Sequence, residues 1–361
     1  MQFSPAKDNY LCHCMAKEKT DIRALSKQEI EAQCIAWGYP AFRAKQVMEW
    51  IWKKAIISFD QMVNVPKSLK EQLNEHFVIN AIKEDIRQKS FDGTIKFRFK
   101  LFDGKKIESV LIPVPEENRY TVCVSSQVGC SLDCSFCATG KMGLIRNLGT
   151  GEIFDQVFRV NEICESTYGH PITNVVYMGM GEPLLNYARV IKSIRYITGD
   201  PGMGMAARRI TISTSGIAKM IRKLADEGLK INLALSLHAA DSLKRTDLMS
   251  INESNDLPEL MDALKYFYDK TGNKLSFEYL ALRGINDTAE DAIKLAGLCK
   301  KFPVLVNIIE YNRVQGINFK GSTTETINAF AKRLRNLGIM ATFRQSRGKD
   351  IDAACGQLAN K

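Results

Sequence analysis

Residues 129–140 read GCSLDCSFCATG and place three cysteines in one short loop flanked by Gly and Ser. Cys130, Cys134 and Cys137 form a C-x3-C-x2-C triad, and no fourth cysteine follows nearby. Cysteine thiolates hold iron–sulfur clusters, whose reduction potentials extend to strongly negative values. The triad therefore predicts a cubane [4Fe–4S] cluster with three irons held by the protein and the fourth iron open to another ligand.

A zinc site is the alternative for the same three thiols. Structural zinc normally takes four protein ligands, often as two closely spaced cysteine pairs. The triad stands alone in its region and lacks a second pair. The pattern therefore favours the cluster over zinc.

The spacing resembles the signature of the radical S-adenosylmethionine (SAM) superfamily, which usually has an aromatic residue before the third cysteine, as Phe136 is here. Residues 178–183 read MGMGEP and resemble the motif of that superfamily for the amino end of SAM. Gly181 lets the backbone approach a ligand closely, and Glu182 can accept hydrogen bonds from an ammonium group. Gly-Glu-Pro also makes an ordinary turn, but its place after a strand favours the ligand site.

The composition indicates a folded chain with a basic surface. The chain has 361 residues, 45% of them hydrophobic, and at ~150 residues per domain this length favours about two domains. Fifty Lys and Arg against 40 Asp and Glu give a formal charge of +10, which favours polyanionic partners, nucleic acid first. Charge alone leaves open a basic protein that binds no nucleic acid.

Ten cysteines raise the question of the redox compartment. The N-terminus has no hydrophobic signal run, and no apolar stretch approaches the ~18 residues of a membrane span. We therefore expect a cytoplasmic protein without a membrane partner, in which clustered cysteines indicate a metal or catalysis. Cys12 and Cys14 lie in a polar segment typical of a flexible leader, and Met15 is a second possible start besides Met1. The sequence assigns no role to three scattered cysteines, Cys34, Cys164 and Cys299.

The first third of the chain predicts a small accessory domain of helices followed by strands. Residues 1–20 indicate a flexible leader, and residues 21–114 the accessory domain. Helical periodicity covers much of residues 25–77 and leaves basic side chains on the outer face. This is typical of the solvated face of an ordinary helical module, and an RNA contact here depends on the resemblance that the later motifs carry. Strands follow over residues 79–114, where TIKFRFKLF alternates and Asp103-Gly104 indicates a hairpin.

Residues 115–348 predict an α/β core in which six apolar strands alternate with amphipathic helices. This alternation indicates a parallel sheet with crossover helices, which we interpret as a partial β/α barrel. Its chemistry should lie at the C-terminal ends of the strands. Residues 349–361 form a tail. The expected helices lie near residues 150–168, 187–199, 217–227, 257–271, 288–301 and 323–337.

Short polar residues lie at the ends of three of these strands. Taken singly, each is typical of a loop cap, and the histidine is also typical of a buried core position. Together, such groups can fix the ribose, carboxylate and adenine of SAM. The candidates are Ser213, Ser236-Leu237-His238 and Asn312.

Cys355 and Cys123 stand apart from the triad. Free cysteines are usually inert and buried, and Cys123, in the strand YTVCVSS, fits that description. Cys355 lies in the Gly- and Ala-rich tail GKDIDAACGQL, where a core role is harder to explain.

Taken together, the motifs resemble those of the dual-specificity adenine-C2 RNA methyltransferases. The resemblance runs from about residue 25 to the C-terminus and is carried by CVSSQVGCSLDCSFCATGKMGLIRNL, VVYMGMGEPLLN, ITISTSG, LSLHA and RGKDIDAACGQL. It implies methylation of adenosine at C2 in 23S rRNA, at the peptidyl transferase centre, and in certain tRNAs. It also implies a one-electron donor of the flavodoxin or ferredoxin type and a monomeric enzyme.

The resemblance further implies a two-stage chemistry that consumes two SAM molecules for each methyl group. One SAM methylates Cys355, and a second is cleaved to a radical that takes a hydrogen from the methylated cysteine, whose carbon then adds to the adenine. Glu108 matches the proposed proton acceptor of the family, and Cys123 frees the product by forming a transient disulfide with Cys355. Without the resemblance, Glu108 is also typical of a solvated strand carboxylate.

Two alternatives stay open. A related family methylates C8 of adenine; Pro183 resembles the C2 enzymes, whereas Arg313 departs from the proline that often follows the residue matching Asn312. A non-catalytic iron–sulfur protein that binds RNA would explain the triad and the charge, but neither GMGEP nor Cys355.

Overall fold

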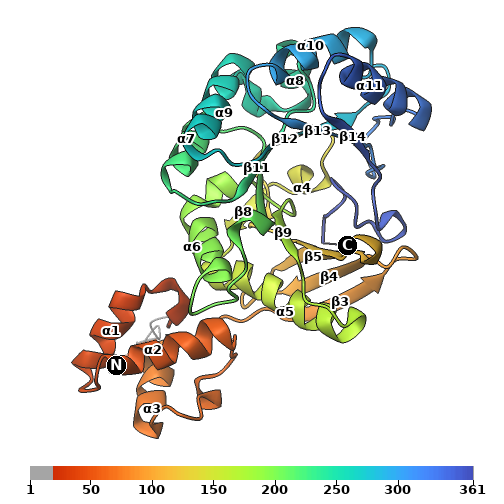
Figure 1. Cartoon of the computed structure of the whole chain (residues 1–361). Coiled ribbons are helices and arrows are strands. Elements are labelled where there is room, and N and C mark those ends of the chain that lie inside the picture. Colours follow the sequence, from red (N-terminus) through yellow and green to blue (C-terminus); the bar gives the residue numbers. More distant parts are fainter. Residues whose placement is uncertain (1–18, 361) are drawn as a thin grey trace, which may run out of the picture.

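The computed structural model describes residues 19–360. The expected leader, with Cys12 and Cys14, lies outside these residues except for its last two positions. A single ten-stranded sheet dominates the molecule, and helices cover its outer face (Figure 1). No helix in the described part of the chain is long and apolar enough to span a membrane.

The parallel part of the sheet contains the six predicted strands. They are β6 (Arg119–Cys123), β9 (Asn174–Tyr177), β10 (Ile210–Thr214), β11 (Asn232–Ser236), β12 (Leu275–Ala281) and β13 (Leu305–Glu310). A seventh strand, β14 (Ala341–Arg344), pairs with β13 in parallel. Sequence analysis missed it because it has four residues, two of them polar. The sheet ends at β14 without closing, which confirms the predicted partial barrel.

The predicted crossover helices are confirmed to within a few residues. They are α5 (Thr150–Tyr168), α6 (Tyr187–Thr198), α7 (Ala218–Asp226), α9 (Leu257–Thr271), α10 (Ala289–Cys299) and α11 (Thr324–Asn336). Their ends follow local signals: Asp256 caps the N-terminus of α9, and Gly272 ends it in the left-handed conformation. Two short helices, α4 (Ala138–Lys141) and α8 (Ser242–Leu248), lacked the length for a periodic signal.

Three antiparallel strands extend the sheet beyond β6. They are β3 (Lys83–Lys89), β4 (Ile95–Lys100) and β5 (Lys106–Val114), and β4 and β5 form the predicted hairpin. Because β5 pairs with β6, the sheet continues across residue 114, and the division into domains there stays a prediction. The alternating apolar side chains of β4 are buried as expected, but so is Lys96 on the opposite face.

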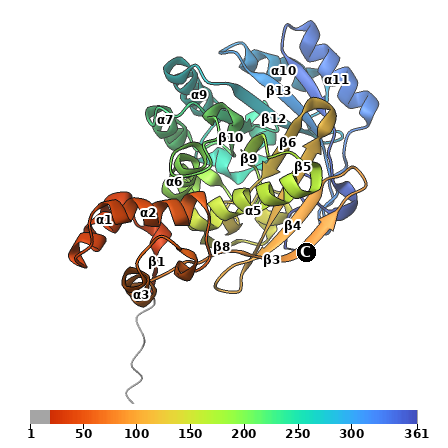
Figure 2. The same ribbon diagram turned by 60° about the horizontal axis from the view of Figure 1, so that its bottom comes forward.

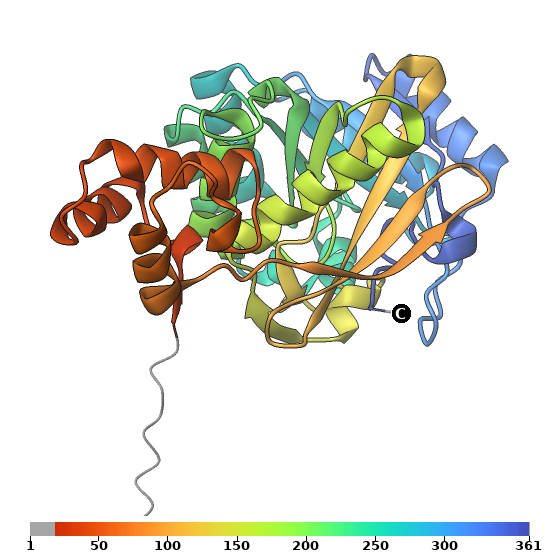
Figure 3. The ribbon, with the colours of Figure 1, turned by 90° about the horizontal axis from the view of Figure 1, so that it is seen from below.

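The helices of the N-terminal region stand beside α5 and α6, away from the extension strands (Figures 2 and 3). They are α1 (Lys27–Ala36), α2 (Phe42–Met48), which continues into a π-helical turn at Glu49–Lys53, and α3 (Lys67–His76). A small parallel pair, β1 (Thr20–Asp21) with β2 (Phe77–Val78), ties their ends together. Ser26 and Glu29 form a capping box at the start of α1.

Two buried contacts join these helices to the core. Trp52 stacks on Tyr196 of α6, with ring centroids 3.7 Å apart. Arg23 Nη1 donates to Asp155 Oδ1 of α5 at 2.6 Å, and both side chains are almost fully buried. A side chain at Gly151 would place its Cβ 2.3 Å from the guanidinium carbon of Arg23, so glycine makes room for this pair.

Replacing Asp155 with Ala should destabilise the protein strongly, because the buried Arg23 charge would lose its nearer ionic partner and keep only the Asp21 carboxylate, 3.5 Å from its Nε atom, among the described residues. Removal of one member of a buried ion pair typically costs about 3–5 kcal/mol. Thermal unfolding measures the loss. The control is Glu162→Ala, which removes an exposed partner of Arg159 on the same helix and should change the midpoint little. Equal midpoints for the two variants would contradict this role for the buried pair.

Candidate active site

Two adjoining cavities lie at the carboxyl ends of the parallel strands. The larger, second cavity is lined by Cys123 and by residues of β5, β14 and the tail, while the cluster triad gathers at the first. Cys355 and Arg344 line both cavities and therefore lie at the boundary between them. The predicted residues that line the first cavity are Cys130, Cys134, Cys137, Gly181, Glu182, Ser213, Ser236, His238, Asn312 and Cys355.

The loop that carries the triad is framed by a short hairpin of β7 (Gln127–Gly129) and β8 (Leu144–Asn147). Its three thiols line one cavity, yet among residues 19–360 no group of three His, Cys, Asp or Glu side chains is arranged to hold a single metal ion. Zinc binds thiolates at about 2.3 Å and draws them around one centre. A cluster instead meets each cysteine at a separate iron, so these residues fit a [4Fe–4S] cluster better than zinc.

Gly181 and Glu182 shape the wall that follows β9. Gly181 has φ +94°, and a Cβ there would lie 2.4 Å from Cβ of Gln127, so only glycine fits. The Glu182 carboxylate accepts N–H groups from Leu184 at 3.0 Å and Ser215 at 2.8 Å. Burial raises the pKa of Glu182, and these hydrogen bonds oppose the rise. The side chains of Thr214 and Ser215 also bond to this carboxylate, and its place on the cavity wall favours a cationic ligand.

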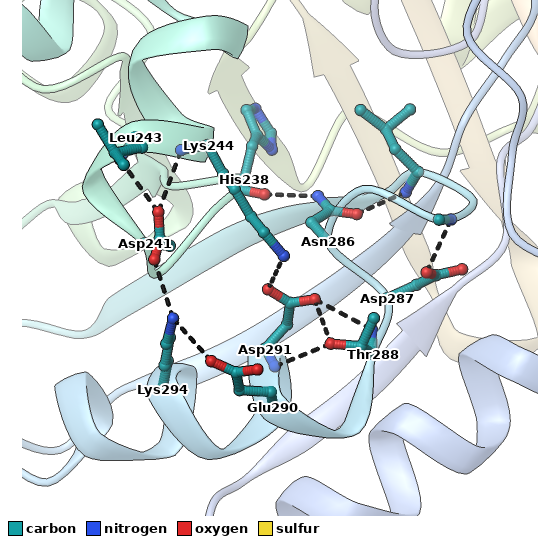
Figure 4. Close-up of polar contacts among 12 residues, drawn as sticks. His238, Asp241, Leu243, Lys244, Asn286, Asp287, Thr288, Glu290, Asp291 and Lys294 are labelled. Carbon is teal, nitrogen blue, oxygen red and sulfur yellow. Dashed lines mark hydrogen bonds and ion pairs between the residues drawn. The ribbon is translucent and has the colours of Figure 1, made fainter.

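His238 follows β11 with φ +56°, a conformation that non-glycine residues rarely adopt. Asn286 supports it by donating to the His238 carbonyl at 2.6 Å, as Figure 4 shows. The Leu280 N–H donates to Nδ1 at 3.0 Å. Burial, followed by the Arg245 charge, lowers the pKa of His238 to about 3. The ring is therefore neutral, and its proton is on Nε2.

Cys123 and Cys355 meet at the second cavity. Burial raises the pKa of Cys123 to about 12. Cys355 is an exposed residue that lines both cavities. The protein around its thiol reduces contact with water and so raises the pKa of the thiol. The Arg344 charge opposes both rises, because a cation stabilises a thiolate. Arg344 thus favours the nucleophilic form of both thiols.

Sequence reasoning missed three residues of this region: Arg344, Glu278 and Asn286. Glu278 is buried in β12 and lines the first cavity; its Oε1 accepts from Asn307, while its Oε2 has no hydrogen-bond partner within residues 19–360. Its charge within the apolar run LSFEYLAL was an available signal. Arg344 lies on β14, a strand that was not predicted. The Asn286 side chain donates to the backbone carbonyls of His238 and Leu280, and no sequence pattern near either residue indicates its role.

Two predicted site residues line neither cavity. Leu237 is fully buried in the core, and its backbone carbonyl accepts a hydrogen bond from Arg245. Glu108 is also fully buried; its Oε2 accepts the N–H groups of Ala359 at 2.8 Å and Asn360 at 3.0 Å. The structure therefore sets Glu108 against the tail, and its role as a proton acceptor stays a prediction.

Comparisons with known proteins agree with this geometry. A model described as the ribosomal RNA large subunit methyltransferase N-terminal domain matches residues 20–79, and the radical SAM superfamily model matches residues 124–296. A protein of Christiangramia forsetii, named a probable dual-specificity RNA methyltransferase RlmN, is 50% identical over 98% of this chain and 99% of its own. The chain belongs to the RlmN family of dual-specificity RNA methyltransferases. A Flavobacterium psychrophilum RlmN relative is 51% identical over 96% of this chain and 99% of its own.

A solved structure extends the agreement to the fold. The crystal structure of a radical SAM methyltransferase from Sphaerobacter thermophilus has a TM-score of 0.88 and 39% identity, covering 95% of this chain and all of that one. Membership of the RlmN family confirms the predicted family and enzyme class, with a [4Fe–4S] cluster and SAM as cofactors.

Replacing Asn286 with Ala should raise the dissociation constant of SAM about tenfold, because His238 would lose the bond that holds its strained backbone. A lost neutral hydrogen bond of about 1.4 kcal/mol corresponds to this factor. Titration calorimetry of the iron-loaded protein measures the affinity. Lys294→Ala is the control, since Lys294 forms ion pairs with Asp241 and Glu290 at the surface nearby (Figure 4). An unchanged affinity in Asn286→Ala would remove this supporting role.

Proposed function

We propose that this enzyme methylates C2 of adenosine in 23S rRNA and in tRNA, with Cys355 as the methyl carrier. The observation that carries the proposal is that Cys355 lines both cavities, whereas Cys123 lines only the second. A carrier must meet SAM first and the base afterwards. Its place at the boundary allows both encounters through a small movement of one side chain.

The first cavity suits SAM. Glu182 would receive the amino group of SAM, and Ser213, Ser236, His238 and Asn312 would hold its other polar groups from neighbouring strand ends. Leu237 would act from outside the cavity, because its backbone bonds to Glu278 and Arg245 hold the neighbouring Ser236 and His238 in place.

Cys130, Cys134 and Cys137 would hold the cluster, which supplies the single electron that cleaves SAM when it is bound. No described side chain supplies a fourth thiolate within the triad's own loop, so the fourth iron would stay open for SAM.

Cys355 first accepts a methyl group by displacement, with Arg344 favouring its thiolate. The methyl carbon would lose one hydrogen atom to the radical that SAM supplies and would bond to C2 of the adenine, which would give up its proton to a base and one electron to the cluster. The Cys123 thiolate then attacks the carrier sulfur. A disulfide forms, and the sulfur–carbon bond breaks with its electron pair going to the carbon, which then takes a proton. A reductant afterwards returns both cysteines to thiols.

The second cavity suits the adenosine and its backbone. Arg119 and Arg347 line it together with Arg344, and such side chains bind phosphate oxygens well. Delivery of a base to this depth requires that it leave its stack. The basic accessory region, residues 21–114, would hold the surrounding RNA through phosphate contacts, with salt-sensitive affinity.

The remaining parts of the proposal follow from the same chemistry. A flavodoxin- or ferredoxin-type protein would supply the electron, and the enzyme would act as a monomer in the cytoplasm, where its RNA substrates are. Residues 115–348 would form the catalytic core and residues 349–361 the carrier tail.

Methylation at C8 and methylation at C2 are distinguished by which methylated nucleoside the enzyme produces. Nucleoside mass spectrometry of RNA from cells with and without the gene, against synthetic standards, should show the loss of 2-methyladenosine. A loss of the C8-methylated nucleoside instead would overturn the proposal. No change in either nucleoside would favour a non-catalytic iron–sulfur protein that binds RNA.

Cys355→Ala should abolish methyl transfer, whereas Cys123→Ala should trap a covalent RNA adduct because the carrier sulfur cannot be displaced. Denaturing gels with labelled RNA detect the adduct. Cys164→Ala is the matched control, since Cys164 is buried on α5 and lines neither cavity. Methylation by Cys355→Ala, or adduct-free turnover by Cys123→Ala, would refute the assigned roles.

A further inference from the structure

Glu108 and Lys96 form a buried ion pair on the face of the extension strands that the tail covers. Lys96 Nζ lies 3.5 Å from Glu108 Oε1, and both side chains are almost fully buried. The other oxygen, Oε2, accepts the N–H groups of Ala359 and Asn360. The end of the described tail, Asn360, contacts Arg98 of β4 and Glu108 of β5, in the region marked by these strand labels in Figure 1. Burial of two charges costs free energy unless other groups bond to them. This pair therefore needs further hydrogen bonds to offset the loss of water.

The tail supplies hydrogen bonds to Oε2 of Glu108, whereas Oε1 faces Lys96 and has no hydrogen-bond partner among the described residues. Its last described residues give the carboxylate two charge-assisted hydrogen bonds, which are stronger than neutral ones. Arg98 adds a longer contact by donating to the Asn360 carbonyl at 3.4 Å. Without residues 359 and 360, Glu108 would lose both backbone donors. The ion pair and the end of the tail therefore stabilise each other.

Further hydrogen bonds fix the tail between Glu108 and Cys355. Thr139 donates to the Leu358 carbonyl at 2.6 Å, and the Ala138 N–H donates to the Gly356 carbonyl at 2.9 Å. Gly356 has φ +83°, which permits the turn next to Cys355. The carrier cysteine thus sits between the loop that bears the triad and the anchor at Glu108.

We propose that Glu108 is a positioning residue that latches the C-terminal tail and so holds Cys355 at the boundary between the two cavities. The inference rests on the proposed role of Cys355 as methyl carrier. Glu108 lines neither cavity, so it acts through the tail. A thiol confined in this way meets its partners at high effective concentration, and loss of confinement slows each encounter.

Two observables test the latch. Hydrogen exchange of the peptide covering residues 353–360, in purified enzyme without SAM, reports tail docking. The mass gained by Cys355 on incubation with SAM reports carrier methylation. Glu108→Ala should speed exchange of this peptide and slow methylation, each at least tenfold. Glu108→Gln should recover most of both, because its amide oxygen still accepts the two N–H groups.

The matched control is Glu84→Ala on β3, the next strand but one from β5; Glu84 forms an ion pair with exposed Arg87, and the variant should leave both observables unchanged. Truncation after Leu358 removes the two latched N–H groups and should reproduce the effects of Glu108→Ala. In the truncated enzyme, Glu108→Ala should add no further loss, since residues that act through one contact are not additive.

The outcomes separate the alternatives. Tail exchange that is unchanged in Glu108→Ala, or full methylation after truncation, would overturn the latch. A proton acceptor would instead make Glu108→Gln as inactive as Glu108→Ala towards RNA, with normal tail exchange. If wild-type Cys355 gained no methyl group while exchange still responded to Glu108, the carrier role would fail and the latch would stand. If Glu108→Ala does not fold, tail exchange and Cys355 methylation in the truncated enzyme and in Glu108→Gln test the proposal instead.

Discussion

The hydrogen-bonded ladder between β5 and β6 is the contact on which the arrangement of this site depends. It attaches an antiparallel extension to a parallel barrel sheet, and its register sets Val110 opposite Cys123. Glu108 on β5 and Cys123 on β6 therefore belong to adjacent strands of one rigid sheet. The tail docks on the first of these strands and presents Cys355 beside the second. Without this ladder, the tail would have no fixed surface near the resolving cysteine.

The core was predictable because its signals are local. Each buried strand is an apolar run, each helix has a clear period, and parallel topology brings strand ends to one edge, so Glu182, Ser213 and His238 could be placed together before the structure was known. Arg344 was missed because its strand is short and polar. The burial of Lys96 was missed because a segment more than 250 positions away in the chain covers it, and no pattern in β4 reports that contact.

The electrostatics of the two cavities differ in a way that suits their proposed contents. The first contains Glu182 and Glu278, and the Oε2 atom of Glu278 has no hydrogen-bond partner in the described part of the chain, which suits a cationic cosubstrate. The second contains Arg119 and Arg347 against one carboxylate, Asp92, and shares Arg344 with the first; this excess of positive charge suits an anionic backbone. Cys355 lies where these fields meet, between the Arg344 and Glu278 charges that shift its pKa in opposite directions. Its reactivity is therefore open to change by whichever ligand fills a cavity.

The stacking of Trp52 on Tyr196 and the buried Arg23–Asp155 pair make the N-terminal helices a fixed arm rather than a tethered one. A fixed arm has a consequence for selectivity. If an RNA is bound by these helices, its target base enters the second cavity only when the distance and direction from the bound part of the RNA to that base fit the enzyme. The N-terminal helices would then select RNA by its shape. Two RNAs of unrelated sequence could both be substrates if their folded shapes were similar.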